Sequence, residues 1–125
     1  MKSQEIVIKK EELDFTNFFR NKKILSNTKK DVAVFQVITT FEPSLTAEIH
    51  ENCVDVFIIK EGSEELFIGG EMINKKLVSP GEWVGTSLVG ARKYQVGSDD
   101  IVVIPKGVAH QHGQGQIKFF VIKIS

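Results

Sequence analysis

Cysteine is nearly absent from this chain of 125 residues, and neither sign of charge is in excess. Cys53 is the only cysteine, so no disulfide can form within the chain, which suits a reducing compartment. Sixteen basic residues balance sixteen acidic ones, which gives no electrostatic reason to expect nucleic acid or an anionic membrane as partner. The N-terminus has no apolar stretch of signal-peptide length, and no run could span a bilayer. We therefore expect a cytoplasmic protein.

The residues that are present predict a single domain built from strands. Hydrophobic residues make up 42% of the chain, which is ordinary for a globular protein. Short segments rich in Val, Ile and Phe are separated by Gly, Pro, Asn and Asp, as strands are. They cover 32–39, 46–50, 55–60, 65–68, 101–104 and 117–124. No convincing long helix separates them, so the pattern favours an antiparallel sandwich, jelly roll or barrel.

Residues 1–31 look less regular, and we expect them to form an N-terminal arm. Within the arm, Phe15, Phe18 and Phe19 have the i, i+3, i+4 spacing that places three rings on one face of a helical turn. We expect the arm to pack on the barrel or on a partner subunit.

Two of the predicted strands are apolar on both faces. The segments IVVI (101–104) and FFVI (119–122) do not alternate, although a sheet with one wet face should. Their outer face is therefore expected to be covered by the arm, by the other sheet or by a second subunit. This pattern predicts a homodimer.

All three histidines, with two nearby carboxylates, fall into two short segments. Glu48 and His50 are two residues apart, and so are His110 and His112, so each pair faces one side of a strand. With Asp55, His50 and His110 make a two-histidine, one-carboxylate set, a common arrangement around a divalent metal with open positions.

These segments resemble the two motifs of the cupins. In EIHENCVDVFIIKEG, Glu48-x-His50 is followed after four residues by Asp55 and after six more by Gly62. The family pattern is H-x-H, three or four residues, E, six residues, G. Glu48 therefore stands where a cupin has its first histidine, and Asp55 stands where it has a glutamate.

The second motif, DDIVVIPKGVAH, is the more specific match. Asp100, Pro105, Gly107 and His110 all fit the pattern G-D-x-x-x-x-P-x-G-x-x-H. Asp99 replaces the leading turn glycine, and Asp is among the residues that tolerate the left-handed region.

The resemblance implies an all-β fold, a cupin-type jelly-roll barrel (double-stranded β-helix) over residues 32–125. By position it implies His50, Asp55 and His110 as metal ligands, with Glu48 as a fourth. The ion would be Zn, Mn, Ni or Fe, since these suit imidazole and carboxylate ligands. His112 has no counterpart in the motif, and strand parity points it the same way as His110, which makes it a candidate catalytic base.

Two classes of function stay open at this point. One is a metal-dependent enzyme, such as a dioxygenase or isomerase, acting on a small polar molecule. The other is a module that binds a small ligand without metal. Between the motifs, residues 69–97 carry the only Trp and the only Tyr, Trp83 and Tyr94, together with Arg92. The Gly and Pro residues of this segment predict an added hairpin that forms a lid, a dimer contact or simple hairpin packing.

Overall fold

A computed structural model describes residues 7–9, 11, 22–27, 32–39 and 46–125. The helical turn predicted for Phe15, Phe18 and Phe19 lies outside the described residues. Within the described ranges, no helix is long and apolar enough to cross a membrane.

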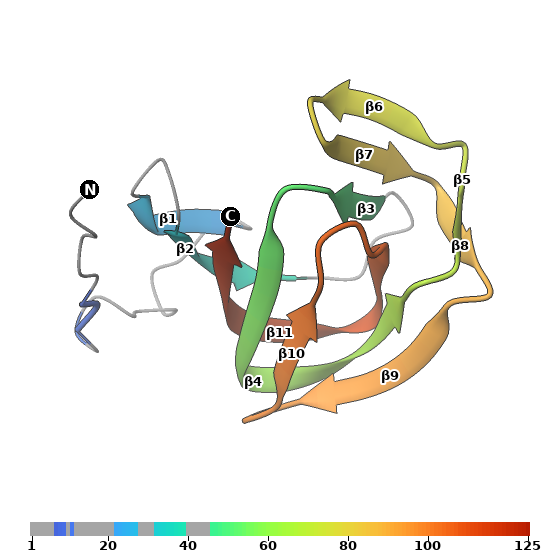
Figure 1. Cartoon of the computed structure of the whole chain (residues 1–125). Coiled ribbons are helices and arrows are strands. Elements are labelled where there is room, and N and C mark those ends of the chain that lie inside the picture. Colours follow the sequence, from blue (N-terminus) through green and yellow to red (C-terminus); the bar gives the residue numbers. More distant parts are fainter. Residues whose placement is uncertain (1–6, 10, 12–21, 28–31, 40–45) are drawn as a thin grey trace.

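The described residues form a curved nine-stranded sheet and a small two-stranded one (Figure 1). The strands are β1 (Lys22–Asn27), β2 (Val32–Ile38), β3 (Ala47–His50), β4 (Val54–Ile68), β5 (Glu71–Ile73), β6 (Lys76–Ser79), β7 (Glu82–Gly85), β8 (Ser87–Val89), β9 (Arg92–Gly97), β10 (Ile101–Ile104) and β11 (His110–Ile124). The large sheet runs β1-β2-β11-β3-β7-β6, and β4 pairs with β9, β10 and β11. β5 pairs with β8.

Two long, bent strands, β4 and β11, enclose the interior of the barrel. They pair antiparallel from Val54↔Ile124 to Ile68↔His110. β4 joins the two strands predicted at 55–60 and 65–68, because Gly62 bends the chain without ending the pairing. Gly62 has φ +92°, and a Cβ there would lie 2.1 Å from the Gln116 carbonyl oxygen. Only glycine fits such a position.

The interior between these strands is filled mainly by aromatic and aliphatic side chains. Phe57 and Ile59 of β4 and Phe119 of β11 are at most 2% exposed. The buried core cluster comprises Phe35, Phe57, Ile59, Leu66, Val96, Ile104, Ile117, Phe119 and Val121. Because residues two apart on a strand face the same side, the same inner face of β4 also carries Asp55, which is 2% exposed.

The two segments that lack alternation differ in how they are covered. Phe119 and Val121 belong to the core, and Phe120 between them is also buried, at 8% exposure. On β10, Ile104 is buried, but Ile101 and Val103 are 67% and 57% exposed. The outer face of β10 is therefore not covered by the described part of the chain, and the homodimer remains a prediction.

Part of the N-terminal arm and all of the 69–97 segment are more regular than expected. β1 lies within residues 1–31 and pairs with β2, so the sheet begins at Lys22 rather than at residue 32. Residues 69–97 form five strands instead of one hairpin. Three of them extend the large sheet, since β7 pairs with β3, β6 with β7 and β9 with β4. As predicted, Asp99 has a left-handed backbone, with φ +71°.

Candidate metal centre

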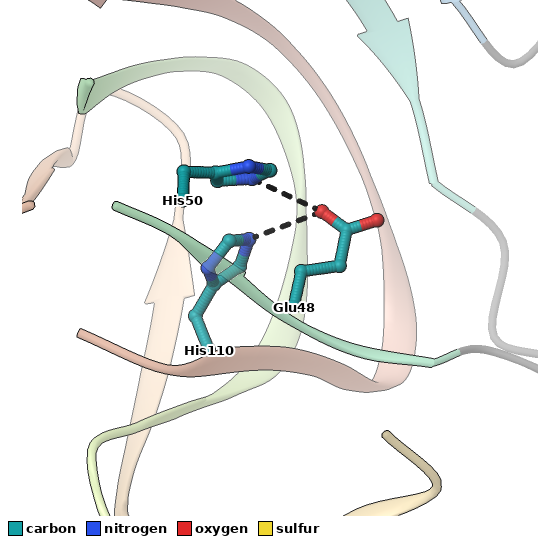
Figure 2. A group of neighbouring side chains, drawn as sticks. All are labelled: Glu48, His50 and His110. Atoms are coloured by element: carbon teal, nitrogen blue, oxygen red, sulfur yellow. Dashed lines mark ion pairs between the residues drawn. The ribbon is translucent and has the colours of Figure 1, made fainter. Parts of the chain in front are cut away.

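Three side chains with metal-binding atoms converge inside the barrel (Figure 2). Glu48 and His50 come from the same face of β3, and His110 is the first residue of β11. The two strands place His110 directly opposite Glu48. One ligand atom from each side chain lies within 4.8 Å of the other two.

Both imidazole rings face one carboxylate oxygen. Oε2 of Glu48 lies 3.3 Å from Nε2 of His50 and 3.7 Å from Nε2 of His110. The two ring centroids are 5.4 Å apart. Two ligand atoms at about 2.1 Å from a tetrahedral zinc ion lie about 3.4 Å from each other, so these separations suit a shared metal ion.

The far nitrogen of His50 is held by a second carboxylate. Nδ1 of His50 lies 2.7 Å from Oε2 of Glu82, which sits opposite His50 on β7. When Nδ1–H donates to Glu82, the lone pair of Nε2 is directed at Glu48 and His110. Metal-binding histidines are commonly oriented by such a carboxylate.

Each histidine of the centre also has a buried nitrogen without a hydrogen bond. These atoms are Nε2 of His50 and Nδ1 of His110. An unsatisfied buried polar atom costs about 1–3 kcal/mol, so such atoms call for an explanation. A metal ion would satisfy Nε2 of His50, and the residues present therefore fit a divalent cation.

Charges at the centre are distributed in a way that also favours a cation. Burial lowers the pKa of His110 to about 4, so this ring is neutral at physiological pH, as a metal ligand must be. The pKa of Glu48 falls to about 2, chiefly through its interaction with His50, which outweighs the opposing effect of burial. Burial acts to lower the pKa of His50, but Glu48, Asp55 and Glu82 together raise it above 6.5. The carboxylates around His50 thus favour positive charge at this position.

Asp55 lies beside the three converging residues but has another partner. Nζ of Lys123 is 2.9 and 3.1 Å from its two carboxylate oxygens. One of these oxygens, Oδ2, is 3.6 Å from Nε2 of His50. The thiol of Cys53 is 3.7 Å from the other oxygen, and burial raises the pKa of that thiol. Metal ligation by Asp55 stays a prediction, and its pairing with Lys123 makes Glu48 the better-placed carboxylate.

His112 points into the barrel, next to the three converging residues. Its ring centroid is 6.0 Å from that of His110, and its side chain is 18% exposed. Nδ1 of His112 lies 2.5 Å from Oε1 of Glu64, a residue with no solvent exposure. The ring is thus on the inner face, as strand parity indicates, while its catalytic role stays a prediction.

No protein-family model matches the chain, and no curated protein matches it. Solved structures do. A cupin-2 domain protein from Shewanella frigidimarina is 19% identical with a TM-score of 0.59, over 95% of each chain. A cupin-like protein from Thermotoga maritima is 19% identical with a TM-score of 0.53, over 82% of this chain and 66% of that one.

This chain has the cupin fold. The DMSP lyase DddQ from Ruegeria pomeroyi shares the fold, with 14% identity and a TM-score of 0.57 over 83% of this chain. The cupin barrel described here spans 46% of that lyase and 65% of the EutQ protein from Clostridium difficile. At these identities the likeness concerns the fold alone.

Three residues that pair with the predicted site residues were not themselves predicted from the sequence. Glu82 reaches His50 only because β7 pairs with β3, and nothing in the sequence indicates that pairing. Glu64 shares the inner face with Phe57 only after the bend at Gly62, which interrupts simple alternation. The inward direction of Lys123 could have been predicted, because Lys123 has the same strand parity as Phe119 and Val121 on β11.

Proposed function

We propose that this cupin barrel binds one divalent metal ion through Glu48, His50 and His110, and that a small polar molecule binds beside it. The observation that carries the proposal is His50, whose Nδ1 is held by Glu82 while its buried Nε2 has no hydrogen bond. Nε2 faces the Glu48 carboxylate at 3.3 Å and lies next to the ring of His110, which is the position where a metal ion would be held.

The number of protein ligands allows a small molecule to bind to the proposed metal ion. Three protein ligands leave coordination positions open to a small molecule. An ion of the Zn, Mn, Ni or Fe type would supply Lewis-acid activation of an oxygen atom of that molecule. The side chain of Glu48 is 45% exposed, so the centre is reached from solvent on that side.

The chain's own residues would bind and act on the molecule. His112, next to His110, would accept a proton from it or donate a hydrogen bond to it. Asp55 forms an ion pair with Lys123 and lies beside His50. This pair would hold the Asp55 carboxylate in place next to the metal centre. The proposal thus assigns binding to the metal centre and proton handling to His112.

Metal analysis of protein purified without a metal-affinity tag tests the proposal. We expect about one equivalent of divalent metal per chain, taken up from the cell or from added zinc. His110→Ala should lose the metal and keep the β-rich circular dichroism spectrum. His112→Ala removes a histidine two residues away and is the matched control, which should retain the metal.

Two outcomes would overturn the proposal. One is full metal stoichiometry in the His110→Ala protein, which would place the ion elsewhere. The other is a wild-type protein that binds no divalent ion, which would leave a metal-free ligand-binding module as the function.

A further inference from the structure

We propose that Glu64 positions His112 as a proton acceptor, so that the chemistry of this barrel is a proton transfer from the bound molecule. The inference rests on the proposed function for the presence of that molecule. It concerns different residues from the metal centre, so the two can be tested separately.

Glu64 is a buried carboxylate that contacts His112. It has no solvent exposure, and its Oε1 lies 2.5 Å from Nδ1 of His112. Its other oxygen, Oε2, accepts a hydrogen bond of 2.8 Å from Oγ1 of Thr39. Thr39 is fixed in turn, because its Oγ1 accepts the backbone N–H of Ile117 at 3.2 Å. The carboxylate therefore cannot turn away from His112 without losing a buried hydrogen bond.

Two aromatic neighbours fix the orientation of the His112 ring. Phe57 stacks on it with an interplanar angle of 16° and a centroid distance of 5.7 Å. Phe119 lies 5.7 Å away, tilted by 46°. Both phenylalanines are almost fully buried, so packing and the hydrogen bond to Glu64 together define one orientation of the ring.

This arrangement determines which nitrogen can accept a proton. A neutral imidazole has one N–H donor and one acceptor nitrogen. Because Glu64 accepts from Nδ1–H, Nε2 of His112 is the acceptor. The ring centroid of His112 lies 6.0 Å from that of His110, so the ring that carries this acceptor is a neighbour of the metal centre.

The step that follows is a balanced proton transfer. A C–H or O–H bond of the bound molecule breaks, its proton moves to Nε2 of His112, and the electron pair of that bond stays on the molecule. The reaction class is thus one initiated by a base. It is an isomerisation where the proton returns to another atom of the molecule, or an elimination where the electron pair expels a leaving group from it, and the step itself consumes no oxidant or reductant. The Glu64 carboxylate stabilises the positive ring that forms.

Acylation of His112 by diethyl pyrocarbonate tests the assignment, since the reagent reacts with an accessible acceptor nitrogen. In zinc-loaded protein at about pH 8, peptide mass spectrometry should find His112 modified. Glu64→Met keeps the side-chain length and removes the acceptor, and the rate at His112 should fall by about tenfold or more as the proton moves to Nε2. Nitrogen-15 NMR should show the loss of the Nδ1–H signal of His112 in the same variant.

Glu65→Met is the matched control. Glu65 is the next residue on β4, faces the other way and pairs with Lys93 at 3.3 Å. This variant should leave the acylation rate and the His112 signals unchanged. If Glu64→Met does not fold, Thr39→Val, which removes only the hydroxyl bonded to Glu64, should slow acylation by a smaller factor.

A purely structural pair would give a different result. The inference is overturned if His112 of the wild-type protein resists acylation, or if its proton resides on Nε2. An unchanged acylation rate in the Glu64→Met protein would overturn it as well. Failure of the protein to bind zinc is a separate outcome, which metal analysis detects. That result would count against the metal centre, while the modification of His112 would still report on Glu64.

Discussion

Removing the negative charge of Glu82 should weaken metal binding without touching a metal ligand. Glu82→Gln keeps the shape of the side chain and replaces the oxygen that lies 2.7 Å from Nδ1 of His50. Losing such a supporting carboxylate costs about 10–100-fold in metal affinity. The side chain of Glu82 is 41% exposed, so water can partly replace it, and we expect the lower limit. A tenfold loss corresponds to about 1.4 kcal/mol.

Competition with a chromophoric chelator measures this loss as a change in the zinc dissociation constant. Glu51→Gln is the control. Glu51 follows His50 in the chain, but its side chain accepts a hydrogen bond from Nε1 of Trp83 at 2.9 Å and forms no ion pair with a histidine among the described residues. We expect its zinc affinity to equal that of the wild type. Equal affinity in the Glu82→Gln protein, or an equal loss in both variants, would refute the role assigned to Glu82.

Three further predictions follow from the same geometry. Because the pKa of His50 is raised and that of His110 is lowered to about 4, zinc binding near neutral pH should displace protons from His50 and not from His110, and affinity should fall as pH drops through the pKa of His50. Calorimetry in buffers of different ionisation enthalpy would contradict this by finding two protons released or none. Lys123→Met leaves the buried Asp55 carboxylate unpaired and should lower the free energy of unfolding by about 3 kcal/mol, and a urea midpoint equal to that of the wild type would argue against the pair. The exposed outer face of β10 should pair two chains, so sedimentation should show a dimer that Ile101→Glu converts to monomer, and a wild-type monomer at micromolar concentration would exclude it.

The sequence predicts the fold and the two site-bearing segments well, because both depend on local patterns. The spacing of Asp100, Pro105, Gly107 and His110 defines a turn and a strand end that the structure contains. The run of Val, Phe and Ile around Phe57 likewise predicts a strand, which the structure contains within β4. The lengths of β4 and β11 were not predictable from alternation, because Gly62 lets the chain bend within a continuous strand.

Side-chain partners inside the barrel could be predicted only where residues are close in sequence or belong to the two motifs, as His50 and His110 do. Glu48 and His50 share a face of β3, and their proximity follows from parity alone. Pairing across strands is a property of register, so neither Glu82 at His50 nor Glu64 at His112 could be found. The prediction of Asp55 as a metal ligand has the same limit. It did not take account of Lys123, which lies directly opposite Asp55 on β11.

The raised pKa of His50 also changes one sequence-based expectation. The ordinary pKa of histidine predicts that metal occupancy falls below about pH 6. With Glu48, Asp55 and Glu82 around His50, protons compete with the metal at a higher pH than that.

Anomalous diffraction from zinc-loaded crystals, recorded at the zinc edge, tests the metal centre most directly. We expect one strong peak per chain, about 2.0–2.2 Å from Nε2 of His50 and from ligand atoms of His110 and Glu48. The Nδ1 atom of His50 should remain hydrogen-bonded to Glu82 in the same crystals. A peak held by other residues, or no peak in crystals of the zinc-saturated protein, would contradict the metal centre proposed for this barrel.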